Sequence, residues 1–287
     1  MRKEGDFIMA TLREQMTRDM QLRGLSDRTQ DAYLQKVRDF ALYFKKSPAL
    51  VTEEEIKEYL QHIRVEKKVS DSTYRQAYGA LKFLYQTTLK RNMVFEKIPV
   101  LKNRRKLPVV LDRTEVEALF SATPNLKHKA ILMIIYSAGL RLSETANLKI
   151  SDIDSKRMMI RVQQGKGGND RYTLLSAVAL ETLRQYWRKY RPSEWLFPGQ
   201  TKTGRINPKS IQNIFKVASE RAGLTKRASV HTLRHSFATH LLEAGTDIHH
   251  IQTLLGHKNI QNTTIYLHLR RKDLAKVVSP LDTVTAL

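Results

Sequence analysis

Residues 231–266 read HTLRHSFATHLLEAGTDIHHIQTLLGHKNIQNTTIY. The stretch opens with a histidine and an arginine, His231 and Arg234, that are three positions apart. Residues at this spacing lie on one face of a helix. We therefore expect a helix here that points both side chains at a single target, and we expect His235 to point elsewhere.

Two further groups of reactive residues extend this pattern along the chain. Downstream, the segment LLGH ends at His257, and Tyr266 follows nine positions later. Upstream, residues 139–144 read GLRLSE, so that Glu144 follows Arg141 by three. Glu144 can orient an arginine or a histidine, although a simple helix ion pair is an equally good interpretation. Taken singly, such residues are most often surface ion pairs or core side chains.

A glycine-rich turn lies between these groups. Residues 165–170 read GKGGND, and short strand-like segments at 158–162 and 172–175 flank them. This pattern predicts a β-hairpin whose turn carries Lys166. The lysine can approach a narrow target and donate a proton, but lysines in such turns are commonly just solvated.

The amino-terminal part of the chain has helical periodicity from residue 11 to residue 91. One predicted helix buries a single face, made by Tyr33, Val37, Phe40, Ala41 and Phe44. A second begins at a capping box formed by Thr52 and Glu55, and a third begins near Asp71. A new capping pair, Asp112 with Glu115, restarts the helical pattern after residue 110.

Basic residues are dense in these helices and in the segment that follows them. Residues 93–110 contain Pro99 and Pro108 and interrupt the helical pattern, so we expect an interdomain linker there. The candidates for phosphate contact are Lys67, Lys68, Arg75, Lys82, Lys102, Arg104 and Arg105. An ordinary solvated helix face, or a plain exposed linker, would have the same composition.

The composition of the whole chain favours a polyanionic partner. Its 287 residues include 50 Lys and Arg but only 28 Asp and Glu, which gives a formal net charge of +22. The chain has no cysteine, which excludes disulfides, thiolate nucleophiles and cysteine-ligated zinc. No stretch approaches the roughly 18 uninterrupted apolar residues that a membrane-spanning helix needs. We expect a soluble, cytoplasmic protein that binds nucleic acid.

In this order and at this spacing, the four reactive segments resemble those of the tyrosine recombinase family, the phage-integrase and Xer-like enzymes. The resemblance covers nearly the whole chain. It implies a mainly α fold with a small antiparallel β-sheet, organised as a helical DNA-clamping bundle at 1–92, a basic linker at 93–110 and a mixed α+β catalytic domain at 111–287 with a C-terminal tail helix. The catalytic residues that it implies are Arg141, Lys166, His231, Arg234, His257 and Tyr266.

The resemblance also implies a reaction, cleavage and rejoining of DNA strands through a 3′-phosphotyrosyl link to Tyr266, with no metal or nucleotide cofactor. Guanidinium groups can hold the two non-bridging oxygens of a phosphodiester, which suits the two arginines. Lys166 would protonate the leaving 5′ oxygen, and His231 would accept the phenolic proton. His257 would donate a hydrogen bond to a phosphate oxygen.

The implied partners are double-stranded recombination sites and further copies of the chain, in a tetramer on two DNA sites, with or without a related recombinase. The tail after Tyr266 would pack on a neighbouring subunit or on its own domain. Two other functions remain open: nicking and resealing by a type IB topoisomerase, and DNA binding by an accessory protein without catalysis. The sequence does not distinguish integration, excision, inversion and dimer resolution, and it does not identify the target site.

Overall fold

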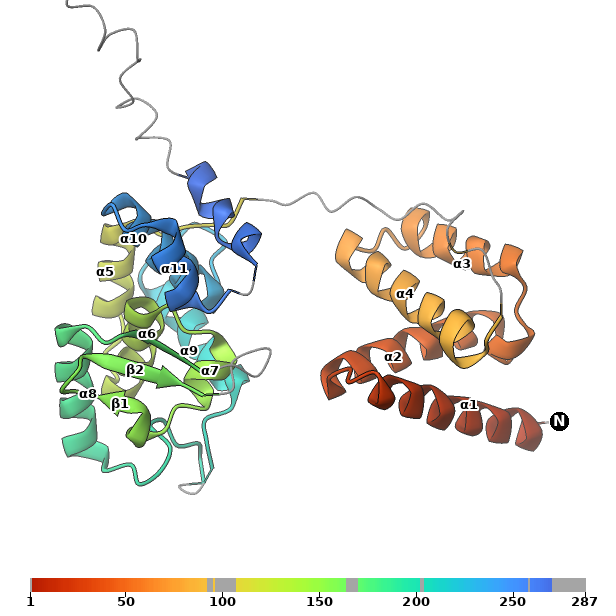
Figure 1. The fold of residues 1–287 in the computed structure, drawn as a ribbon, viewed down its shortest axis with the longest axis horizontal. Helices are drawn as coiled ribbons and strands as arrows, with labels where there is room; N and C mark the ends of the chain where they lie inside the picture. The colour runs from red at the N-terminus through yellow and green to blue at the C-terminus, as the bar shows by residue number, and fades with distance from the viewer. Residues whose placement is uncertain are drawn as a thin grey trace, which may run out of the picture. The chain divides into compact units, whose positions relative to one another are not determined.

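The computed structural model describes residues 2–91, 95, 107–163, 170–201, 204–257 and 259–269, with side chains from residue 11 to residue 267. The chain divides into two compact units, Met1–Arg105 and Lys106–Leu287, each of which is described by itself (Figure 1). The division falls inside residues 93–110, where the sequence predicts a linker. The domain bounds 1–92 and 111–287 remain a prediction.

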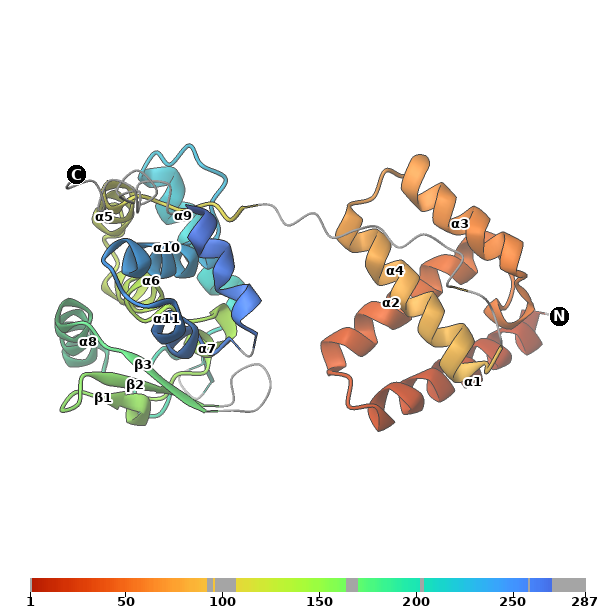
Figure 2. The same cartoon turned by 45° about the horizontal axis from the view of Figure 1, so that its top comes forward.

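The first unit is a helical bundle. Its elements are α1 Arg2–Leu22, α2 Asp27–Phe44, the short η1 Pro48–Leu50, α3 Glu53–Val65, α4 Asp71–Phe83 and the π-helical turn η2 Leu84–Thr88. Helix α4 lies between α2 and α3 (Figures 1 and 2). The predicted capping box at the start of α3 is confirmed: the backbone N–H of Thr52 donates to Glu55 at 2.8 Å, and the Thr52 hydroxyl accepts from the Glu55 N–H.

The core of this unit is the apolar face that the periodicity predicts. Phe40 and Ala41 of α2 are buried, and aromatic side chains of three other elements join them, among them Tyr59, Tyr74 and Tyr85. The α-helical pattern of α4 ends at Phe83, earlier than the sequence pattern suggests. The π-turn that follows still buries Tyr85, whose hydroxyl donates to the Pro48 carbonyl at 2.7 Å.

The second unit is also mostly helical, with one small sheet. Its helices are α5 Arg113–Ser121, α6 Leu126–Ala138, α7 Leu142–Ala146, α8 Ala177–Tyr190, α9 Pro208–Arg221, α10 Val230–Glu243 and α11 Ile248–Leu255, with short 3₁₀ turns η4 Ile150–Asp152, η5 Ile260–Asn262 and η6 Thr264–Leu269. Helix α6 packs against both α8 and α10. It is apolar on nearly all sides, which is typical of a central buried helix.

The predicted hairpin is present. Strand β2 Met159–Val162 pairs antiparallel with β3 Arg171–Leu174, with Met159 opposite Leu174. A two-residue strand, β1 Ile153–Asp154, adds to the other edge of β2 and is not predicted from the sequence. The predicted turn, with Lys166, lies outside the described residues. The mainly α fold with a small antiparallel sheet is confirmed.

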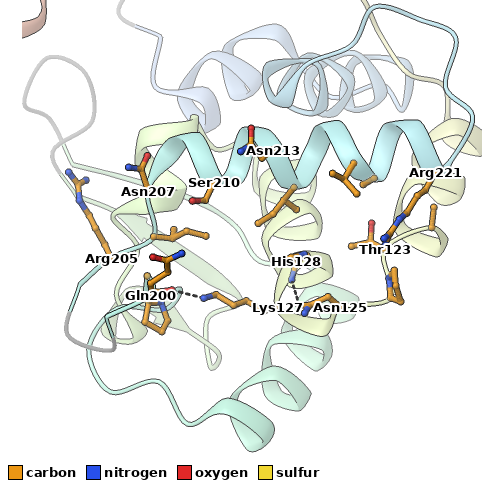
Figure 3. Close-up of a pocket in the computed structure, with 18 of the residues that line it drawn as sticks. Thr123, Asn125, Lys127, His128, Gln200, Arg205, Asn207, Ser210, Asn213 and Arg221 are labelled. Atoms are coloured by element: carbon orange, nitrogen blue, oxygen red, sulfur yellow. Dashed lines mark hydrogen bonds between the residues drawn. The ribbon is translucent and has the colours of Figure 1, made fainter.

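The second unit also contains a cavity of about 870 Å³ that runs along α9 and is bordered by the start of α6 and by the residues between α8 and α9 (Figure 3). Lys127 of α6 donates a hydrogen bond to the Pro198 carbonyl there, and burial lowers the pKa of this lysine. Asn207, Ser210 and Asn213 line it from α9 and the residue before it. Of the predicted catalytic residues that the structure describes, none lines this cavity. Among the described residues, no helix combines the length and the apolar character that crossing a membrane requires.

Candidate active site

Arg234 of α10 joins the ends of two other helices. One of its Nη atoms donates to the carbonyl of Gly139, directly after α6, and the other donates to the carbonyl of Leu255, the last residue of α11, at 2.7 Å. Carbonyls at helix ends lack partners within the helix and carry partial negative charge. Arg234 is 4% exposed, so its guanidinium is fixed within the fold.

Glu144 of α7 lies within this cluster and binds two further arginines. Arg171 of β3 makes a two-pronged bond to its carboxylate, at 2.8 Å on each side, and Arg141 donates to it at 2.6 Å. Burial alone would raise the pKa of Glu144, but the bonds and charges of Arg171 and Arg141 outweigh it and hold the pKa at about 2. Glu144 therefore orients arginines, which is the role that its spacing suggested.

Arg171 is a member of the site that sequence reasoning missed. Its Nε donates to the Leu254 carbonyl at 2.9 Å, so each of its three nitrogens has a partner within the fold. Arg171 lies outside the four reactive segments of the sequence. It reaches the site because β3 pairs with β2 and packs against α11. No feature of the local sequence would have identified it.

The charges in this cluster do not balance. In the part of the chain that the structure describes, the ion pairs of Arg141, Arg171 and Arg234 converge on one carboxylate, that of Glu144, and the nearest Arg234 nitrogen is 3.7 Å from it. Burial and the charge of Arg141 lower the pKa of Arg234 to about 9, so it stays charged at neutral pH. The Arg141 side chain is 20% exposed and is the most accessible of the three. A site with this excess of positive charge is suited to a phosphate.

His257 lies directly against Arg234. Its Nε2 is 3.1 Å from an Nη atom of Arg234, and its Nδ1 is 2.9 Å from the Thr263 hydroxyl. Guanidinium nitrogens only donate, so Nε2 must accept and Nδ1 must carry the proton. Burial, followed by the charges of Arg234 and Arg141, lowers the pKa of His257 to about 4, which keeps the ring neutral.

The two histidines of the first motif have different surroundings. His231 lies exposed in the first turn of α10, and partial desolvation with the charges of Arg234 and Arg141 lowers its pKa. His235 is half-buried, and its Nδ1 is 2.9 Å from the hydroxyl of Tyr266. The prediction that His235 points away from the site is wrong. His235 follows His231 by four positions, and residues four apart share a helix face just as residues three apart do.

Tyr266 is 1% exposed and packs in an apolar cluster with Phe237, Ile251 and Leu255. Burial raises the pKa of its phenol to about 12, while the charges of Arg234 and Arg141 act to lower it. The α10 and η6 segments therefore bring the predicted nucleophile close to the arginine cluster.

The structure therefore brings five of the six predicted catalytic residues together, and Lys166 is the one outside the described residues. Of the predicted DNA-binding residues, Lys67 and Lys68 are exposed in the loop between α3 and α4, and Arg75 and Lys82 lie two turns apart on α4. Lys102, Arg104 and Arg105 lie outside the described residues, as does the predicted tail helix.

Comparison with known proteins identifies the family of the chain. Residues 109–273 match the phage integrase family, and residues 12–94 match the phage integrase N-terminal SAM-like domain. The chain belongs to the phage integrase family. Members of this family are the tyrosine recombinases, so the chain is an enzyme of the tyrosine type that exchanges DNA strands.

Named relatives cover most of the chain. It is 42% identical over 278 residues to a Sinorhizobium fredii protein named "Putative integrase/recombinase y4qK", covering 96% of this chain and 90% of the relative. It is 33% identical over 303 residues to an Escherichia coli integrase/recombinase, covering 91% and 90%. Over 186 residues, it is 38% identical to the tyrosine recombinase XerA of Pyrococcus horikoshii, covering 64% and 65%.

Solved structures share the fold of this integrase-family chain. A XerA recombinase structure aligns with 28% identity and a TM-score of 0.55, covering 93% of this chain and 96% of that chain. The XerH recombinase bound to a palindromic difH substrate, in a post-cleavage complex, aligns with a TM-score of 0.76 at 23% identity, covering 88% and 80%. The two-domain tyrosine recombinase architecture implied by the sequence is confirmed.

Proposed function

We propose that this chain is a site-specific DNA recombinase that cuts and rejoins strands through a 3′-phosphotyrosyl link to Tyr266. The observation that carries the proposal is the cluster of three arginines around one carboxylate, placed within electrostatic reach of a buried tyrosine. Tyrosine is a weak nucleophile at neutral pH, and it needs nearby cations and a base.

Arg141 and Arg234 hold the scissile phosphate. As the tyrosine oxygen attacks, negative charge builds on the two non-bridging oxygens, and fixed guanidinium donors stabilise this charge without rearranging. Arg234 is held by helix-end carbonyls, while the more exposed Arg141 is the better placed to reach an incoming phosphate. Arg171 and Glu144 keep the cluster in place.

Protons move at both ends of the reaction. The phenolic proton passes to an imidazole, for which the sequence predicts His231, and Lys166 protonates the departing 5′ oxygen. His257 donates to a phosphate oxygen in the transition state. To do so from Nε2, it must give up the bond that Nε2 now accepts from Arg234 and carry its proton on that nitrogen.

The substrate is double-stranded DNA, and the assembly is a tetramer on two recombination sites. The high positive charge supports this partner, as do the exposed lysines after α3 and the basic residues of α4. Relatives of this fold include recombinases solved on their DNA, such as XerH on difH. The linker residues Lys102, Arg104 and Arg105, which the sequence predicts to contact phosphate, would strengthen this binding.

The test is covalent capture. Wild-type protein and the Tyr266→Phe variant are incubated with fragmented genomic DNA without divalent metal, stopped with detergent, and the DNA-linked peptide is mapped by mass spectrometry. We expect an adduct at Tyr266 that the variant lacks, and the trapped fragments give the target sequence. Non-covalent binding alone would contradict the proposal and favour an accessory DNA-binding protein. If the adduct formed but the cut strand were only rejoined to itself, with no exchange between duplexes, a topoisomerase would be favoured.

A further inference from the structure

The hydroxyl of Tyr266 has a specific partner that the sequence did not predict. Its Oη is 2.9 Å from Nδ1 of His235, and the two ring centres are 5.8 Å apart. The tyrosine comes from η6 and the histidine from the second turn of α10, and these two elements pack against each other. Because the tyrosine is almost fully buried, this contact fixes the direction of the oxygen inside the site.

The chemistry of the pair sets the direction of the hydrogen bond. Burial raises the pKa of Tyr266 to about 12, while burial, His231 and Arg234 lower the pKa of His235 to about 4. Both groups are therefore neutral near pH 7. A neutral phenol donates well and a neutral imidazole accepts at one nitrogen, so the phenol donates to Nδ1 and the proton of the ring lies on Nε2.

The other histidine of the motif has a different exposure. His231 lies exposed at the start of α10, one turn before His235, with Arg234 between them in sequence. An exposed imidazole beside the arginines is well placed for a phosphate oxygen. A half-buried imidazole on the phenol is well placed for the proton of the nucleophile.

We propose that His235, rather than His231, takes the phenolic proton of Tyr266 when its oxygen attacks the phosphate. This inference rests on the proposed function and refines it. In the step, the bond from Oη to phosphorus forms and the bond from phosphorus to the 5′ oxygen breaks. The phenolic proton moves to Nδ1 of His235, the 5′ oxygen receives a proton from Lys166, and religation reverses both transfers.

A bound phosphate helps His235 to hold that proton. After burial and the charge of His231, the positive charge of Arg234 contributes to the low pKa of His235. A phosphate diester held by the arginines offsets this charge, and the offset grows as negative charge builds in the transition state. The imidazolium of His235 thus forms at the stage of the reaction when the positive charge of the arginines disfavours it least.

The hydrogen bond can be tested without DNA. In protein labelled with ¹⁵N in its histidines, we expect His235 to carry its proton on Nε2, and we expect the Nδ1 resonance to move in the Tyr266→Phe variant. A proton on Nδ1 in the wild type, or an unchanged resonance in the variant, would overturn the inference. This measurement does not depend on the proposed function.

The proton transfer is tested with two substitutions of His235. Asparagine places an oxygen near the position of Nδ1 and can accept the hydrogen bond, but it cannot take the proton, whereas alanine does neither. We expect both His235→Asn and His235→Ala to slow adduct formation by about 10²-fold or more, which is the range of general base catalysis. The probe is a nicked duplex built from a fragment that the wild type traps, and circular dichroism checks the fold of both variants.

A second duplex, with sulfur in place of the scissile 5′ oxygen, separates the two proton transfers. Sulfur leaves without a proton, so this duplex should restore cleavage by the Lys166→Ala variant but not by the His235 variants. If His235→Asn formed the adduct at the wild-type rate, His235 would be a positioning residue only. If the sulfur duplex restored cleavage by the His235 variants, His235 would act in protonating the 5′ oxygen. Either result overturns the inference. If the wild type forms no adduct at Tyr266, the proposed function itself fails.

Discussion

At the scale of single residues, the site depends on one carboxylate that holds positive charge in place. Glu144 is almost completely buried and bonds to Arg171 and Arg141, with Arg234 close by. Three guanidinium groups in one buried volume would repel one another, and the carboxylate compensates one of the three charges. The remaining excess of positive charge favours phosphate binding but destabilises the fold. Glu144 therefore limits the loss of folding stability that the charged site causes.

We therefore predict that Glu144→Gln destabilises the fold at pH 7 by about 3–5 kcal/mol, the usual cost of breaking a buried ion pair from one side. The pKa of Glu144 is about 2 in the fold against an ordinary value of 4.5, so its stabilisation is complete above pH 4.5. It is lost as the pH falls from 4.5 towards 2. Urea denaturation at pH 7, 5, 4 and 3 measures the free energy of unfolding. The difference in this free energy between wild type and variant should become smaller only at pH 4 and pH 3.

The exposed Glu181, which lies 3.9 Å and 3.8 Å from two arginines of α8, is a matched control. Glu181→Gln should change stability by less than about 0.5 kcal/mol at every pH, as exposed pairs commonly do. A gap for Glu144→Gln that is the same from pH 7 to pH 3 would show that shape, not charge, is what the substitution disturbs.

Local spacing predicted some of these residues and not others. It placed His231 and Arg234 on one face, and it placed Glu144 beside Arg141, since these pairs lie three apart. The partner of His235 is 31 residues away in η6, and the partners of Arg171 lie on α7 and α11. Contacts of this kind depend on packing between elements, which spacing along one element does not contain.

At the scale of elements, the site depends on how closely helix ends approach. The last turn of α6 meets α10 at Gly139, where φ is +61° and an added Cβ would collide with the Phe237 ring and lie 3.0 Å from Leu255. Only glycine adopts this conformation freely and fits this space. The Gly139 carbonyl also accepts a bond from Arg234, so the close packing and the arginine cluster are linked.

We predict that Gly139→Ala lowers the free energy of unfolding by more than Gly223→Ala does. Gly223 has a similar φ of +65°, but an added Cβ there meets no atom within 4 Å. The control should therefore cost only the left-handed backbone penalty of about 1–2 kcal/mol. Gly139→Ala should cost about 1–3 kcal/mol more from overpacking. Equal urea midpoints for the two variants would mean that the last turn of α6 moves aside freely.

The sequence was also more informative about some elements than about others. Capping boxes and apolar stripes marked the starts and buried faces of α3 and α5, and glycines marked the hairpin between β2 and β3. Strand β1 has two residues and therefore no alternation to detect. The switch from α to π geometry after Phe83 leaves the apolar spacing nearly unchanged, so the sequence did not reveal it.

At the scale of the whole molecule, the charge of +22 predicts that DNA binding depends steeply on salt. For duplex DNA, each phosphate that the protein neutralises makes the slope of log affinity against log salt more negative by about 0.9. If Lys67 and Lys82 each contact a phosphate, the double variant Lys67→Ala/Lys82→Ala should make the slope shallower by about 1.8. Fluorescence anisotropy with a duplex of random sequence, from 50 to 300 mM salt, measures the slope without knowledge of the target site.

The position of these lysines matters as much as their number, and two other lysines separate the two effects. Lys57 and Lys216 form ion pairs within their own helices, with Glu53 at 3.2 Å and Glu220 at 3.8 Å. The double variant Lys57→Ala/Lys216→Ala removes the same net charge, but we expect it to leave the slope unchanged because counterions are released only where phosphate is met. If both double variants make the slope equally shallow, the general positive field of the molecule binds DNA, and Lys67 and Lys82 make no phosphate contacts of their own.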